Sequence, residues 1–306
     1  MSVVYRTQVH DVIIRWNFVE IADHTQAIRR PQAFSRCAGA GWVYSPTSQR
    51  LLVFCMRAAP IAFLNPSSPG YLTKQESIAV AGVDDLLIRS LLDKHQFHDP
   101  LDEALNLGIS SATWPLFGLL WPSGMRLAER MARRPVSGER ILEIGCGLGL
   151  ASLVAHRRGA QVTASDCHPL AHAFLDENTR LNGLLPLPYC HGLWGTAAAR
   201  EDGLPVLTHA HDAPLSGLFD LIVGSDILYE RDDAGTLAQF IGEHAALSSE
   251  IWVIDPNRGN RAAFHKHMAQ LGFAMHEQVL DQAAQGGEDA YKGRMLTYTR
   301  ELRGNT

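Results

Sequence analysis

The sequence predicts an α/β protein in which residues 108–306 form a doubly wound, mostly parallel sheet of seven strands. Beyond residue 121, short apolar runs alternate with longer amphipathic segments, which is the pattern of strands and helices in a parallel sheet. The last two apolar runs flank Gly286 and Gly287 with no helix between them, which indicates a closing antiparallel hairpin.

The elements of this sheet follow in order from the periodicity of the apolar residues. The expected strands span residues 140–145, 161–166, 188–191, 219–225, 251–255, 273–280 and 294–299, and the expected helices span residues 125–134, 150–158, 171–181 and 261–270.

Residues 1–107 read as a smaller, β-rich α+β region with a candidate role in substrate recognition. Runs at 41–44 and 50–54 are expected to be strands, with the turn-forming residues between them closing a hairpin. Residues 83–94 are expected to form a helix, because their leucines and isoleucine recur at helical spacing after two aspartates. The chain is therefore expected to divide near residue 107.

Charge and cysteine usage narrow the class of protein. The chain has 27 basic and 32 acidic side chains, a net charge of −5, without the basic face that nucleic-acid binding needs, so no nucleic-acid partner is expected. Five scattered cysteines without a C-x-x-C pair indicate a reducing, cytoplasmic location. The oligomeric state cannot be read from the sequence.

No membrane span and no metal site are expected. The uncharged stretch between Glu103 and Arg126 is interrupted by prolines, which argues against a membrane helix. Cys167, His168 and His172 lie close in sequence but lack a fourth ligand at a convincing spacing, as do His209 and His211.

A glycine-rich turn lies where the first strand of the sheet meets its helix. Gly145, Gly147 and Gly149 allow the backbone to turn sharply and approach a ligand. A dinucleotide fingerprint would need glycine at the position of Leu150, and Glu143 suits a ligand with an ammonium and a sulfonium better than a pyrophosphate. The pattern therefore favours S-adenosylmethionine over NAD, although three glycines can also serve only a tight turn.

Asp166 ends the second strand, at the edge where the ribose diol of such a ligand would lie. It can equally cap the following helix. Trp194, just past the third strand, can stack on an adenine or simply pack beneath the next loop.

Asp226 and Tyr229 follow the fourth strand and place a carboxylate and a phenol at the same edge of the sheet. Asp226 can accept a hydrogen bond from an attacking amine, and Tyr229 can wall the site and contact a cationic methyl donor. The alternative is a capping aspartate followed by a core aromatic residue.

Five motifs in order carry a family resemblance: L-E-I-G-C-G-L-G-L, T-A-S-D, N-x-x-L-N-G, L-W-G and F-D-L-I-V-G-S-D-I-L-Y. Together they resemble the D-x-x-Y protein lysine methyltransferases, which are class I, seven-strand, Rossmann-like enzymes dependent on S-adenosyl-L-methionine. The resemblance covers about residues 114–300. It implies acceptor-side, catalytic roles for Asp226 and Tyr229 and a cofactor site made of Glu143, Gly145, Gly147, Asp166 and Trp194, with Trp121 matching the aromatic residue that such proteins place over the cofactor. Gly149 and Ser225 are also expected to bind the cofactor.

The sequence is thus expected to encode an S-adenosylmethionine-dependent N-methyltransferase. A protein lysine side chain is the first choice of methyl acceptor, and a small amine or heteroaromatic nitrogen the second. The contrasting hypothesis is a non-catalytic scaffold that keeps the methyltransferase fold.

Overall fold

The computed structural model describes residues 70–194, 213–284 and 290–301 in full, together with the backbone of four short strands nearer the N-terminus. Those strands form two antiparallel pairs: β1 (Arg6–Val9) with β2 (Val12–Arg15), and β3 (Gly41–Ser45) with β4 (Arg50–Phe54). The expected strands at 41–44 and 50–54 are confirmed. The turn at 286–287 and His209 and His211 lie outside the described residues.

A seven-stranded sheet organises the rest of the chain, in the order β12-β13-β11-β10-β7-β8-β9. The strands from β7 to β11 run parallel, whereas β13 is antiparallel to β11 and to β12. The strands are β7 (Arg140–Ile144), β8 (Gln161–Asp166), β9 (Tyr189–His191), β10 (Phe219–Ser225), β11 (Ala245–Asp255), β12 (Ala274–Gln282) and β13 (Tyr291–Arg300). The predicted fold class is therefore confirmed, including the closing antiparallel pair.

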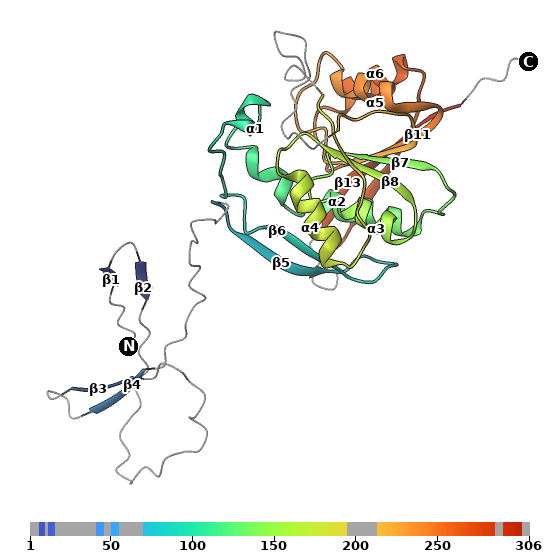
Figure 1. The fold of residues 1–306 in the computed structure, drawn as a ribbon. Helices are drawn as coiled ribbons and strands as arrows, with labels where there is room; N and C mark the ends of the chain where they lie inside the picture. The colour runs from blue at the N-terminus through green and yellow to red at the C-terminus, as the bar shows by residue number, and fades with distance from the viewer. Residues whose placement is uncertain are drawn as a thin grey trace, which may run out of the picture. The chain divides into compact units, whose positions relative to one another are not determined.

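Helices cover both faces of this sheet (Figure 1). The helices α2, α3 and α4 pack with one hydrophobic cluster, and α5 and α6 pack with another. They span α2 (Pro122–Arg133), α3 (Leu150–Arg157), α4 (Ala171–Leu181), α5 (Thr236–His244) and α6 (Arg261–Gln270).

Strand β10 shows how the sequence divides its side chains between the two layers. Leu221 and Val223 belong to the cluster under α2 to α4, and Ile222 to the cluster under α5 and α6. Side chains alternate between the faces of a strand, so a strand that is apolar throughout is buried on both sides.

Residues 83–94 do not form the expected helix. They contain β6 (Leu86–Leu91), which pairs antiparallel with β5 (Thr73–Ile78). Along β6, Leu86 and Ile88 are buried while Leu87 between them is exposed, which is the period of a strand. The prediction was wrong because a short apolar run fits both periods, and here pairing with β5 decides between them.

Asn178 of α4 and Asn182, which caps that helix, attach this hairpin to the sheet domain. Asn178 Oδ1 accepts the backbone N–H of Arg89 at 2.7 Å, and Asn182 Oδ1 accepts that of Leu87 at 2.9 Å. The chain accordingly separates into compact units at Met1–Ser67 and Ser68–Thr306. The break lies 40 residues before the boundary expected at residue 107, because β6 packs on α4.

Two short helices precede α2: α1 (Glu103–Asn106) and the 3-10 helix η2 (Trp114–Gly118). Trp121 occupies the N-cap position of α2. Among the described residues, no helix is both long and apolar enough to cross a membrane.

Candidate functional site

A cleft of about 860 Å³ opens at the carboxyl ends of β7, β8 and β10. Strand order reverses between β7 and β10, since the chain moves outward to β8 and β9 and then returns to β10 on the other side of β7. Open α/β sheets bind their ligands at this kind of switch point. The volume lies within the usual range for small-molecule sites.

All ten residues predicted for the site line this one cleft. They are Trp121, Glu143, Gly145, Gly147, Gly149, Asp166, Trp194, Ser225, Asp226 and Tyr229.

The turn after β7 requires glycine for two separate reasons. Gly145 and Gly147 have φ angles of 60° and 52°, in the left-handed region that side chains rarely adopt. A Cβ on Gly147 would also lie 2.7 Å from the carbonyl oxygen of Phe117. The turn therefore lies directly against η2, and Gly149 follows it as the cap of α3.

Glu143 points from β7 toward α3 and is almost fully buried. Its Oε2 accepts the backbone N–H of Ser152 at 2.8 Å and also the Ser152 hydroxyl. Burial raises the pKa of Glu143 to about 7. This carboxyl group therefore ties the first turn of α3 to β7 from the floor of the cleft.

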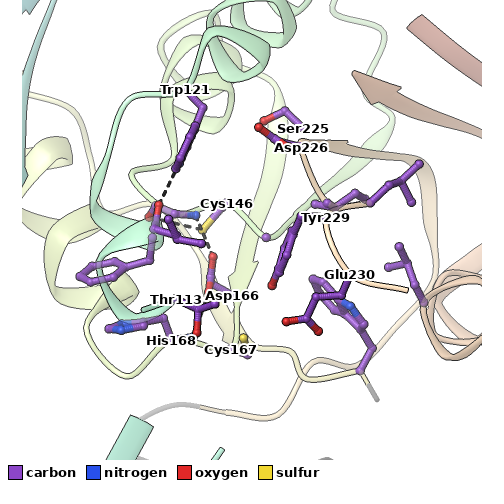
Figure 2. Close-up of a pocket in the computed structure, with 18 of the residues that line it drawn as sticks. Thr113, Trp121, Cys146, Asp166, Cys167, His168, Ser225, Asp226, Tyr229 and Glu230 are labelled. Carbon is purple, nitrogen blue, oxygen red and sulfur yellow. Dashed lines mark hydrogen bonds between the residues drawn. The ribbon is translucent and has the colours of Figure 1, made fainter. Parts of the chain in front are cut away.

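Asp166 joins β8 to the glycine turn. Its Oδ2 accepts the N–H of Gly147 and its Oδ1 accepts the N–H of His168, each at 2.8 Å. Burial raises the pKa of Asp166, and these backbone hydrogen bonds oppose the increase. Figure 2 shows Asp166 and Tyr229 facing the same space from opposite walls.

Two tryptophans lie on the cleft wall. The Trp121 indole donates from Nε1 to the carbonyl of Leu116 at 2.9 Å, which fixes its ring beside η2. Trp194 is half-buried, with its ring centroid 5.5 Å from that of Phe240. Each aromatic ring is thus held by its own contacts within the protein.

Asp226 and Tyr229 lie just beyond the end of β10, after Ser225 (Figure 2). The N–H of Asp226 donates to the carbonyl of Ile254 at 2.8 Å, so its backbone continues the pairing with β11. Tyr229 is 45% exposed, and burial of the rest of the side chain raises the pKa of its phenol. Both groups are reachable from the cleft.

Arg258 is a residue of this cleft that the sequence analysis did not identify. Its Nε donates to Asp226 Oδ1 at 2.6 Å. The only local signal is its place in D-P-N-R, directly after β11, because nothing in the sequence pairs position 258 with position 226.

Acidic side chains outnumber basic ones along the described cleft wall. The carboxylates are Glu143, Asp166, Asp226, Glu230, Asp232 and Asp233, and the guanidinium groups are Arg231 and Arg258. His168, stacked on Phe117 with centroids 3.7 Å apart, adds no charge because burial lowers its pKa to about 3. The cleft therefore favours a cationic ligand or acceptor.

A family model described as "Lysine methyltransferase" matches residues 116–271, just over half of the chain and almost the whole region that forms the cleft. The chain belongs to this family.

The chain is also similar to individual methyltransferases named for different acceptor residues. The electron transfer flavoprotein beta subunit lysine methyltransferase of Danio rerio is 36% identical over 157 residues, which cover 50% of this chain and 53% of that protein. The protein of the same name from Rattus norvegicus is 29% identical and covers 47% and 51%. A histone-arginine methyltransferase of Rattus norvegicus is 31% identical and covers 37% and 47%. The chain spans about half the length of these relatives.

Solved structures give weaker matches. A methyltransferase from Pyrococcus furiosus superposes with a TM-score of 0.44 at 14% identity, covering 60% of this chain and 88% of that one.

Proposed function

We propose that this protein is an S-adenosylmethionine-dependent N-methyltransferase whose acceptor is a lysine side chain of another protein. One observation carries the proposal. In a member of the lysine methyltransferase family, one cleft is lined by the glycine turn and Asp166 on one side and by Asp226 and Tyr229 on the other.

The donor side fits a nucleoside. Gly145 and Gly147 bring bare backbone to the cleft, and a Cβ at either position would lie within 3.0 Å of a neighbouring atom. Asp166 stands at the end of β8, where its carboxylate can accept hydrogen bonds from the two ribose hydroxyls. The aromatic faces of Trp121 and Trp194 offer stacking surface for an adenine. S-adenosylmethionine bound here would supply an electrophilic methyl group on a sulfonium.

Glu143 has a supporting role in this proposal. Because its carboxyl group binds Ser152 of α3, it fixes the helix that follows the glycine turn. We therefore infer that it shapes the donor site from below.

The acceptor side must hold an uncharged amine in line with the methyl group. Asp226 can accept a hydrogen bond from the amine and orient its lone pair, and Tyr229 can exclude water with its ring. The acidic cleft wall favours the approach of a lysine ammonium, which must lose a proton before it attacks. This charge balance supports lysine over an uncharged small-molecule acceptor.

We further propose a cytoplasmic location, supported by five scattered cysteines that include no C-x-x-C pair. For residues 1–107, acceptor recognition stays a proposal.

The test has two steps. Calorimetry first measures binding of S-adenosylmethionine to the purified full chain. The chain is then incubated with a cell lysate and S-adenosylmethionine labelled in the methyl group, and labelled products are located by mass spectrometry. Methyl groups on a lysine of a lysate protein would support the proposal. Label on arginine or a small molecule would assign another acceptor, and no binding of the donor would overturn the proposal.

A further inference from the structure

Arg258 and Asp226 meet across the carboxyl ends of neighbouring strands β11 and β10. Asp226 has a φ of 57°, a left-handed conformation that is costly for a residue with a side chain, and its N–H is bonded to Ile254. The backbone of Asp226 is therefore held in one conformation. Its side chain is 12% exposed, so the carboxylate lies mostly within the protein.

The backbone of Arg258 is fixed as firmly. Asp255 is fully buried, and its Oδ2 accepts the N–H of Arg258 at 3.0 Å and lies 3.5 Å from Nε of Arg261. Asn257 between them has a φ of 64°, which closes a tight turn. This turn directs the Arg258 side chain back toward β10, although that side chain is 39% exposed.

The contact between the two side chains uses only one carboxylate oxygen. Arg258 Nε donates to Oδ1 of Asp226, whereas a bidentate pair would occupy both oxygens. Among the described residues, no hydrogen bond reaches Oδ2. The hydrogen bond to Asp226 raises the pKa of Arg258 above its ordinary value, which is already high, so the guanidinium stays charged.

We propose that Arg258 is a positioning residue that holds Oδ1 of Asp226 and leaves Oδ2 directed to accept a hydrogen bond from an amine at the methyl-transfer position. This inference rests on the proposed function, because that function places the amine beside Asp226. A guanidinium suits the task because it is permanently charged and its N–H groups have a fixed geometry.

Two ligands test this without an acceptor protein. Sinefungin is an analogue of S-adenosylmethionine with a primary amine on the carbon that replaces the methylated sulfonium, whereas S-adenosylhomocysteine has no group at that place. Calorimetry gives the affinity of each, and their ratio reports the amine. One charge-assisted hydrogen bond predicts about a tenfold or greater preference of the wild-type protein for sinefungin.

Arg258→Met should lower the preference for sinefungin over S-adenosylhomocysteine, and Asp226→Asn should lower it by about the same factor. The affinity of Arg258→Met for S-adenosylhomocysteine should change by less than about twofold. Arg258→Lys, which keeps the charge, should restore part of the preference. A matched control is Arg180→Met, since Arg180 is 70% exposed, pairs with Glu177 and does not line the cleft. Its preference should remain that of the wild-type protein.

The outcomes separate the two proposals. If Arg258→Met keeps the full preference for sinefungin, or increases it, Arg258 does not position Asp226. An equal weakening of both ligands would indicate a general effect on the site and would also overturn the inference. If the wild-type protein binds neither ligand, the proposed function fails and the inference with it.

Discussion

Oδ2 of Asp166 accepts the N–H of Gly147 at 2.8 Å, which joins the end of β8 to the turn that follows β7. One carboxylate thus holds the glycine turn in place and presents its remaining lone pairs to the cleft. Under the proposed function, the position of the turn and the contact with the donor would both depend on this side chain.

Replacing Asp166 with alanine should lower the affinity for S-adenosylhomocysteine by about 100-fold or more, because the two hydrogen bonds proposed from the ribose hydroxyls to a charged group are lost at about 1.5–3 kcal/mol each. Calorimetry measures the change. The control is Asp220→Ala, since Asp220 pairs with Arg140 at the opposite edge of the sheet. Equal losses in both variants would argue against a ribose contact.

Gly147→Ala should abolish donor binding and destabilise the protein more than Gly159→Ala. Both glycines have positive φ angles, so both substitutions introduce strain of about 1–2 kcal/mol. Only at Gly147 does the added Cβ approach Phe117, whereas nothing lies within 4 Å of a Cβ on Gly159. Thermal unfolding and calorimetry would compare them, and equal behaviour would show that the approach to η2 is unimportant.

Glu143→Gln should stabilise the protein at neutral pH. The pKa of Glu143 is about 7 in the fold, above its ordinary value of 4.5. The protonated carboxyl therefore contributes stability that is fully present below pH 4.5 and is lost as the pH rises toward 7, a change of as much as about 3 kcal/mol.

The glutamine variant keeps an acceptor for Ser152 but cannot ionise. Its free energy of unfolding, measured in urea, should change less than that of the wild-type protein between pH 4.5 and 7. Parallel curves for the two proteins would show that Glu143 titrates normally.

Asp226→Asn should reduce the rate of methyl transfer by about 100-fold while leaving donor affinity within about twofold, because a misaligned nucleophile typically costs that much. Single-turnover transfer to the acceptor found in the lysate measures the rate. Asp220→Asn, which lies outside the cleft and pairs with Arg140, should transfer normally. Normal transfer by Asp226→Asn would remove Asp226 from the reaction.

Deleting residues 1–67 should leave a folded domain that binds the donor, whereas deleting residues 1–107 should not. The longer deletion removes β6 and leaves Asn178 of α4, which is fully buried, without its partner Arg89. The longer deletion also removes Leu86, Ile88 and Leu91 from the hydrophobic core and exposes the apolar surface they cover, at about 25 cal/mol per Å². Circular dichroism would show whether each truncated chain is folded, and calorimetry would show whether it binds the donor. A stable fragment 108–306 would support the boundary expected from the sequence.

Much of the sheet could be predicted because its signals are local. Strand β8, helix α4 and strand β10 have the bounds that their apolar periods indicated. Helix α5 was missed although Asp232, whose carboxylate accepts the N–H groups of Thr236 and Leu237, marks its start. That aspartate lies among other charged residues, where the capping signal is difficult to recognise.

The sequence by itself determined that the glycine turn, Asp166 and Asp226 would meet, because the carboxyl ends of parallel strands share one edge of a sheet. Only the tertiary structure decided that residues 86–91 form a strand on α4, that Glu143 binds Ser152 of α3, and that Arg258 holds Asp226. The physical reason is the separation of the interacting residues along the chain. Periodicity reports the neighbours of a residue along the chain, whereas Arg89 and Asn178 are 89 positions apart and Asp226 and Arg258 are 32 apart. Such pairs form only when the packed sheet brings their elements together.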